Sequence, residues 1–239
     1  MSQSLGLILC LSGWAQKHNS LEVIFNYPRF GSDEYCLKSL DYSVFKSSES
    51  LFDEFTKYQN CHIAIGWSMG GQLLLRSIAS QIIKPKLLIL IAPPFQMLKD
   101  QRISSGMPKE LYQKVQLALQ QNSATFLRDF LALVAKNDRN ANEIIKDLAV
   151  NEDNFHNLKY WYEVLCDFSC FDLDFNNIPP TLYFHGQGDA VVHISQKNYF
   201  APRIKNFKEI IFDKCGHAPH ISHLQEIRQA IEIFIQDNQ

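Results

Sequence analysis

The chain has 239 residues, of which 46% are hydrophobic and 20% are charged, and its net charge is −2. These values are typical of one globular domain with a sizeable core, and they exclude a disordered chain. A net charge this close to zero provides no strong field for nucleic acid or an anionic membrane, so we expect neither as a partner.

The N-terminal apolar run, residues 5–11, is short and follows no basic region. We therefore expect no secretory signal, no membrane span of ~20 apolar residues and a cytoplasmic protein. The six cysteines contain no CxxC pair, and we expect single reduced thiols. Cys166 and Cys170 would share one face of a helix, which leaves a disulfide or a zinc site as the alternative.

Apolar runs alternate with segments of helical periodicity along most of the chain. The first run is apolar throughout and ends at a glycine, which is typical of a strand buried on both faces. Strands are predicted at residues 5–13, 34–43, 61–67, 84–94, 179–189 and 207–217. Helices are predicted at residues 47–58, 70–83 and 222–236. This alternation predicts a mostly parallel sheet covered by helices on both faces.

One long interval, residues 95–172, interrupts the alternation. It contains no convincing strand, and helices are predicted within it at residues 108–121, 124–136, 141–150 and 154–168. An ordinary crossover connection is the alternative, but the interval is much longer than a crossover needs. We therefore predict an inserted helical cap, residues 95–172, over the carboxyl edge of a core formed by residues 1–94 and 173–239.

A serine stands between glycines in the stretch Gly66-Trp67-Ser68-Met69-Gly70, directly after a predicted strand and before a predicted helix. This is the G-x-S-x-G pattern of a nucleophile elbow in the structural context that the pattern requires. The glycines are needed because the nucleophile has a strained backbone and side chains at those positions would collide with it. We predict that Ser68 is a nucleophile and that the Met69 amide faces an oxyanion; a purely structural turn is the alternative.

A nucleophilic serine needs a base and an acid that orients the base. His217 follows the last predicted strand in "KCGHAPHISH", and Asp189 follows the preceding strand in "YFHGQGDAVV". The order Ser68, Asp189, His217 is the order of an α/β-hydrolase triad. The alternatives are a turn aspartate at Asp189 and a zinc site formed by His217, His220 and His223, although their spacing does not favour a metal.

The second oxyanion donor should lie in the loop after the first strand, where the sequence reads "LSGWAQ". We predict the backbone N–H of Trp14, which follows the flexible Gly13. A core role for Trp14 is the alternative.

The segments "GWSMGG", "SGW", "HGQGDAVV" and "GHAPHISH" together resemble the carboxylesterases that hydrolyse pimeloyl-[acyl-carrier protein] methyl ester in biotin synthesis. The resemblance extends from about Leu5 to Gln236 and implies the α/β-hydrolase fold. It also implies catalytic roles for Ser68, Asp189 and His217. The residues that it implies in substrate contact, besides Ser68 and His217, are Trp14, Met69, Phe130, Leu131, Ala132, Leu133 and Val134.

The resemblance implies hydrolysis of a methyl ester on an acyl-carrier protein, with release of methanol and with no metal or cofactor. We expect a monomer. Rival interpretations are a general short-chain esterase or thioesterase, a menaquinone-pathway lyase on the same scaffold, and a non-catalytic binding module. The chain departs from the family pattern in two places: Ser12-Gly13 replaces His-Gly, and "DYSVFK" replaces a Gly-rich loop.

An acyl-carrier protein is acidic, so an esterase that binds it should present basic side chains near the substrate channel. Acids and bases nearly balance within residues 95–172, so any docking patch must be local. Arg128, beside Phe130, is the best single candidate, with Lys136 and Arg139 expected at the end of the same helix.

Overall fold

The structure is a computed structural model that describes residues 6–26, 35–148 and 156–238. Its centre is a six-stranded sheet in the order β2-β1-β3-β4-β5-β6, in which every neighbouring pair is parallel. The strands are β1 (Gly6–Leu11), β2 (Tyr35–Ser39), β3 (Ile63–Trp67), β4 (Leu87–Ile91), β5 (Thr181–Gly186) and β6 (Phe207–Phe212). The prediction of a mostly parallel sheet is therefore confirmed.

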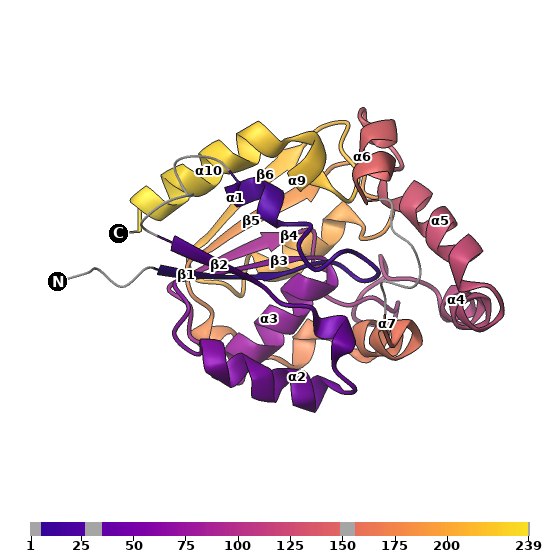
Figure 1. Ribbon diagram of the computed structural model, residues 1–239, viewed down its shortest axis with the longest axis horizontal. Coiled ribbons are helices and arrows are strands. Elements are labelled where there is room, and N and C mark those ends of the chain that lie inside the picture. Colours follow the sequence, from indigo (N-terminus) through magenta and orange to yellow (C-terminus); the bar gives the residue numbers. More distant parts are fainter. Residues whose placement is uncertain (1–5, 27–34, 149–155, 239) are drawn as a thin grey trace.

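Helices cover both faces of the sheet, with α1 and α10 on one face and α2 and α3 on the other (Figure 1). The helices are α1 (Glu22–Phe25), α2 (Ser48–Phe55), α3 (Met69–Ala79), α4 (Lys109–Gln121), α5 (Ser123–Val134), α6 (Ala141–Leu148), α7 (Leu158–Asp167), α8 (Lys197–Phe200), α9 (Pro219–Ser222) and α10 (Leu224–Gln236). Sequence reasoning missed α1, α8 and α9, because four residues are too few to show a helical period.

Each face of the sheet has its own hydrophobic core, because side chains alternate along a strand. In β3, Ile63 and Ile65 pack against the α1 and α10 face, whereas Ala64 packs against the α2 and α3 face. Both sets are fully buried, which explains why the strands read as continuous apolar runs.

The four helices α4 to α7 follow β4 and precede β5, and they gather beyond the carboxyl ends of the strands (Figure 1). We call them the inserted helices. Leu127 and Trp161 join the core under α2 and α3, whereas Leu131 and Val134 join the core under α1 and α10. The inserted helices therefore share both cores of the sheet.

Two predicted segments differ in detail. The second strand ends at Ser39, and residues 42–44 form a 3₁₀ turn because the Asp41 carboxylate accepts the Ser43 amide at 3.0 Å. Helix α7 ends at Asp167, so Cys170 lies in a separate 3₁₀ turn and does not continue a helical face with Cys166. All six cysteines are described and carry free thiols, as expected.

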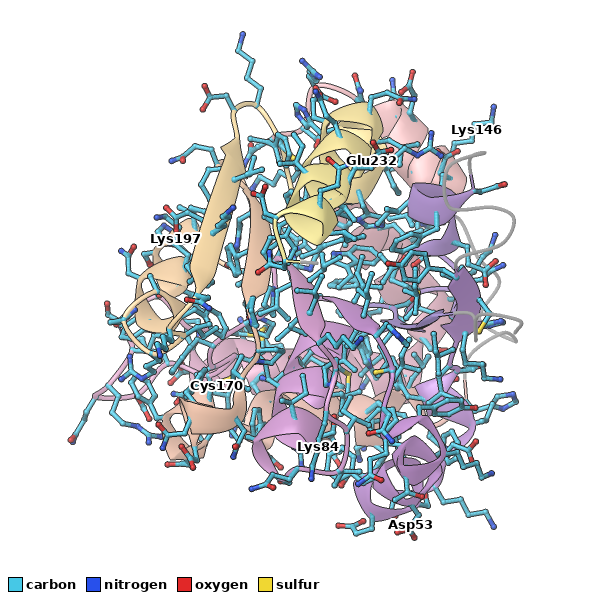
Figure 2. All side chains as sticks on the ribbon, turned by 90° about the vertical axis from the view of Figure 1, so that its left-hand side faces the viewer. Asp53, Lys84, Lys146, Cys170, Lys197 and Glu232 are labelled. Atoms are coloured by element: carbon cyan, nitrogen blue, oxygen red, sulfur yellow. The ribbon has the colours of Figure 1, made fainter. Side chains whose placement is uncertain are left out.

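Figure 2 shows the molecule from the edge at which the strands begin, with charged side chains such as Asp53, Lys84 and Lys146 at the periphery. Among the helices of the described ranges, none is both long and apolar enough to span a bilayer.

Candidate active site

Ser68 lies at the sharp turn between β3 and α3. Its φ of 52° and ψ of −119° are strained for a residue with a side chain. A Cβ atom at Gly66 would collide with the backbone of Gly71, and one at Gly70 would collide with the Leu11 carbonyl. Only glycine fits at both positions, and the turn holds Ser68 at the N-terminus of α3.

Asp189 and His217 follow the neighbouring strands β5 and β6, and the structure brings their side chains together. His217 Nδ1 lies 2.7 Å from Asp189 Oδ2, and both side chains are buried. The other carboxylate oxygen accepts the amides of Val191 and Val192 at 2.8 and 2.9 Å. The carboxylate therefore has one oxygen fixed by the backbone and one directed at the imidazole.

A second histidine contacts the same carboxylate. His185 Nε2 lies 3.0 Å from Asp189 Oδ2 and 2.9 Å from the Val192 carbonyl, while its Nδ1 lies 2.5 Å from the Tyr183 hydroxyl. Sequence reasoning missed His185; the available signal was an imidazole at the end of a buried strand, where a polar group needs partners.

The charge state of Asp189 follows from these neighbours. Burial alone would raise the pKa of the carboxyl, but the charge of His217 and the hydrogen bonds from His185 and His217 outweigh burial and lower the pKa well below its ordinary value. Asp189 is therefore ionised wherever the fold persists near neutral pH.

Ser68 and Asp189 both line one cavity of about 510 Å³. Within the described part of the chain, neither Ser68 Oγ nor His217 Nε2 has a hydrogen-bond partner. Hydrogen bonds between a nucleophile and its base are often long before substrate binds. The serine hydroxyl is thus unengaged at the wall of a substrate-sized cavity.

The cavity wall is mostly apolar, and eight of its eighteen residues come from the inserted helices. The residues that line it are Trp14, Ser68, Met97, Ser105, Gly106, Met107, Leu111, Val115, Phe126, Asp129, Phe130, Leu133, Tyr162, Leu165, Asp189, Ala190, Val191 and His193. This set contains no lysine or arginine, so a neutral and largely apolar ligand suits the cavity best.

Two of the five predicted channel residues on α5, Phe130 and Leu133, line this cavity. The prediction of a continuous lining stretch needs correction, because Leu131 and Val134 are buried in the core and Ala132 is exposed. Successive helical side chains point about 100° apart, so a contiguous run cannot line one wall.

The two predicted oxyanion donors flank Ser68. Trp14 follows β1, and Met69 is the first residue of α3. Among residues with a described placement, neither backbone amide donates to a protein acceptor. The Trp14 indole donates to the Leu158 carbonyl at 3.0 Å and packs edge-on against Phe130, which connects the oxyanion loop to the inserted helices.

The turn after α5 contacts the loops that carry Asp189 and His217. The His217 amide donates to the Val134 carbonyl at 3.1 Å, and the Gly216 amide donates to the Asp138 carboxylate at 2.9 Å. Asn137 Nδ2 donates to the Gly188 carbonyl at 2.9 Å. The inserted helices and the Asp189–His217 pair therefore share one hydrogen-bonded junction.

The sequence model of the Alpha/beta hydrolase family matches residues 8–230 of this chain. The chain belongs to the alpha/beta hydrolase family. The resemblance found in the sequence is also confirmed by curated relatives of this hydrolase.

Pimeloyl-[acyl-carrier protein] methyl ester esterase of Aromatoleum aromaticum is 26% identical over 180 residues, which cover 71% of this chain and 72% of the relative. The protein with the same name from Aliivibrio fischeri is 24% identical over 222 residues, which cover 85% of this chain and 84% of the relative.

Solved hydrolase structures share the fold. An esterase from Exiguobacterium antarcticum superposes with a TM-score of 0.82 at 16% identity, covering 98% of this chain and 92% of the other. MenH from S. aureus superposes with a TM-score of 0.72 at 15% identity, covering 99% of this chain and 96% of MenH. At such identities these structures establish the hydrolase fold alone.

The three clustered histidines of this hydrolase have separate surroundings. His217 Nδ1 contacts the Asp189 carboxylate, and His223 Nδ1 lies 3.2 Å from Glu226 Oε1. The His220 ring packs against the Trp67 ring in a tilted arrangement, with 4.4 Å between the ring centroids. In the described ranges, no group of three or more His, Cys, Asp or Glu side chains is arranged to hold a metal. Trp67 Nε1 also donates to the His217 carbonyl at 2.8 Å, so the residue before Ser68 supports the His217 loop.

His220 should make the stability of this hydrolase depend on pH. It is fully buried without a described hydrogen-bond partner, and burial, with a smaller contribution from His217, lowers the pKa of His220 to about 3. Between pH 3 and 6.5 the unfolded chain binds a proton that the folded chain does not, so the free energy of unfolding should rise with pH.

We expect the replacement His220→Phe to remove up to about 1.4 kcal/mol of this rise for each pH unit. Urea unfolding of both proteins at pH 4.5, 5.5 and 7 measures the slopes. Identical slopes for the two proteins would contradict the prediction.

Proposed function

We propose that this chain is a serine carboxylesterase that hydrolyses the methyl ester of pimeloyl-[acyl-carrier protein] to the free acid and methanol in biotin synthesis. The observation that carries the proposal is the buried Asp189–His217 pair beside an apolar cavity that Ser68 also lines. The names of the curated relatives support the substrate.

In the proposed mechanism, His217 takes the Ser68 proton as Ser68 Oγ attacks the ester carbonyl, and Asp189 stabilises the imidazolium. The amides of Trp14 and Met69 stabilise the oxyanion. His217 then protonates the departing methanol. A water molecule activated by the same histidine releases the free carboxylate from Ser68, so the sequence uses groups of the protein and water.

The cavity supports an acyl substrate. Its wall of aromatic and aliphatic side chains suits a methylene chain, and α5 contributes Phe126, Phe130 and Leu133 to it. A substrate with several carboxylates would find no lysine or arginine among the lining residues. We propose that the inserted helices act as the cap of this site.

The proposed carrier-binding surface lies around Arg128. This residue is exposed on α5, directly before the cavity residues Asp129 and Phe130, and no ion pair occupies it among the described residues. Arg139 is less available, because it lies 4.0 Å from Glu226. The expected place of Lys136 and Arg139 on the same helix needs correction, since α5 ends at Val134.

We expect Arg128→Glu to raise KM for the carrier-bound methyl ester about fivefold at low salt, which corresponds to about 1 kcal/mol, and less at high salt. A small soluble ester should show an unchanged KM. Lys84→Glu is the matched control, because Lys84 is exposed just before β4, at the opposite edge of the sheet (Figure 2). Equal effects of the two reversals would place the docking surface elsewhere.

Two assays test the proposed function. The purified protein should release methanol from pimeloyl-[acyl-carrier protein] methyl ester, and its gene should restore growth of a biotin auxotroph that lacks the demethylating esterase. Hydrolysis of small esters without activity on the carrier-bound ester would instead support a general esterase. If the protein hydrolysed neither the small esters nor the carrier-bound ester, the result would exclude an esterase and favour a lyase on this fold.

A further inference from the structure

The loop that carries the proposed oxyanion donor Trp14 is held from behind by a buried tyrosine. The Tyr42 hydroxyl donates to the Gly13 carbonyl at 2.8 Å, and both groups are buried. We propose that Tyr42 is a positioning residue that orients the Gly13–Trp14 peptide for oxyanion stabilisation. This inference rests on the proposed function, because it assumes an oxyanion at Trp14.

The geometry of the peptide group links the two ends of this contact. The Gly13 carbonyl and the Trp14 N–H belong to one planar trans unit, in which they point in opposite directions. A hydrogen bond that fixes the oxygen on one side therefore fixes the direction of the N–H on the other. The same bond polarises the peptide and makes its N–H a stronger donor.

The carbonyl of this peptide has a single described hydrogen-bond donor. In the described part of the chain, Tyr42 is the one donor to the Gly13 carbonyl. A Cβ atom at Gly13 would lie 3.3 Å from the Trp67 ring, so glycine is favoured over alanine at this position. Glycine leaves the backbone free to rotate, and Ala15 just beyond has a strained φ of 55°. The Tyr42 hydrogen bond therefore favours one orientation of the peptide, together with the packing of the Trp14 side chain.

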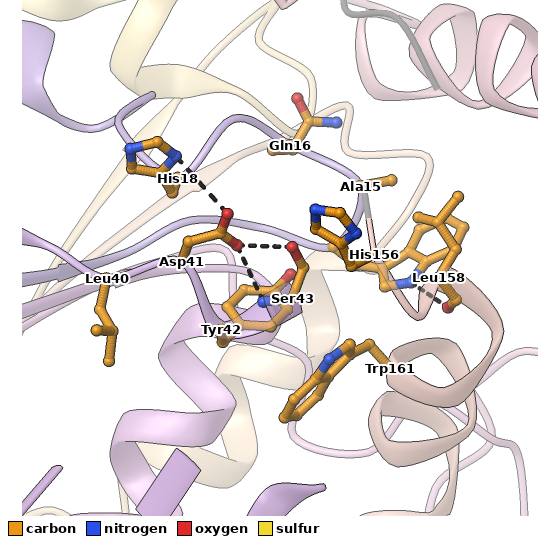
Figure 3. Close-up of a pocket in the computed structure, with 11 residues that line it drawn as sticks. Ala15, Gln16, His18, Leu40, Asp41, Tyr42, Ser43, His156, Leu158 and Trp161 are labelled. Atoms are coloured by element: carbon orange, nitrogen blue, oxygen red, sulfur yellow. Dashed lines mark hydrogen bonds and ion pairs between the residues drawn. The ribbon is translucent and has the colours of Figure 1, made fainter. Parts of the chain in front are cut away.

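Tyr42 is itself well anchored. It begins a 3₁₀ turn capped by Asp41, and its ring packs edge-on against Trp161 at 5.1 Å (Figure 3). Burial, with a smaller contribution from the Asp41 charge, raises the pKa of Tyr42 well above its ordinary value, so the hydroxyl remains a donor. The pocket in Figure 3, which Tyr42 and Trp14 both line, has a volume of about 10 Å³. This volume leaves room for at most about one water molecule.

The test is Tyr42→Phe, which removes the hydroxyl and keeps the ring. Loss of a whole oxyanion donor costs about 100-fold or more in kcat, so a misoriented donor should cost roughly 10-fold. We expect that fall in kcat for a small p-nitrophenyl ester, with KM changed less than twofold. Inhibition by a trifluoromethyl ketone, to which Ser68 would add to form an oxyanion, should weaken in parallel with kcat.

Tyr160→Phe is the matched control. The Tyr160 hydroxyl also bonds a backbone group, the Ser48 amide at 2.8 Å, and its ring also packs on Trp161 at 5.1 Å. The control should lose a similar amount of stability and keep its kcat. Equal kcat for Tyr42→Phe and wild type, or equal losses in both variants, would overturn the inference.

The Ser68→Ala variant separates this inference from the proposed function. If Ser68→Ala retained the wild-type rate, the proposed function would fail and the inference would fail with it. A normal dependence on Ser68 with an unaffected Tyr42→Phe enzyme would overturn the role of Tyr42 alone.

Discussion

Replacing Ser68 with alanine is expected to lower kcat for a p-nitrophenyl ester by roughly six orders of magnitude, as removal of a nucleophile does in a serine hydrolase. The fold should persist, because alanine lacks only the hydroxyl oxygen and Ser68 Oγ has no described hydrogen-bond partner. Steady-state kinetics and thermal unfolding measure the two effects. Ser77→Ala, which removes a buried hydroxyl from the same helix α3, is the control and should remain active.

Ser68→Gly sharpens the same prediction. It should be as inactive as Ser68→Ala but more stable than it by about 1 kcal/mol, because glycine relieves the strain of a positive φ. An active alanine variant would contradict the assignment of the nucleophile. Equal stability of the two variants would contradict the strain.

Asp189→Asn should lower kcat by about 10⁴-fold with a small change in KM. The amides of Val191 and Val192 require an acceptor at one side-chain atom, so the new NH₂ group must face His217 Nδ1. His217 Nδ1 would then have to accept a hydrogen bond from the NH₂ group, which places the His217 proton on Nε2. In this tautomer the imidazole cannot accept the proton of Ser68.

Asp172→Asn is the control for this prediction, because Asp172 is a second aspartate, which lies in the 3₁₀ turn after the inserted helices. Its exposed carboxylate lies 3.3 Å from Arg102. We expect its activity to stay near that of wild type. A larger loss in Asp172→Asn than in Asp189→Asn would show that the acid is misplaced.

The sequence was sufficient wherever a short local pattern determines the structure. The apolar alternation predicted all six strands, and the two glycines around Ser68 predicted the elbow, since both signals arise from neighbours in the chain. The order of Ser68, Asp189 and His217 then placed three residues at one edge of the sheet, because parallel strands end there together.

Other features depend on contacts between distant segments, which local patterns do not encode. Tyr42 reaches Gly13 across 29 residues, and Asp138 reaches Gly216 across 78. On α5, the sequence indicated a substrate-lining stretch, but only the rotation of the packed helix separates Phe130 from its neighbour Leu131. Tertiary packing determines which side chains of the helix face the cavity, and it overrides the pattern in the sequence.

The junction between the turn after α5 and the His217 loop limits how this enzyme can diversify. An insertion or deletion between α5 and α6 would shift Val134, Asn137 and Asp138, and with them the backbones of the loops that carry Asp189 and His217. Helix α4 has no fully buried residue, yet Leu111 and Val115 reach the cavity wall. Under the proposed function, chain-length preference can therefore evolve, or be engineered, through substitutions on α4 that leave the His217 loop undisturbed.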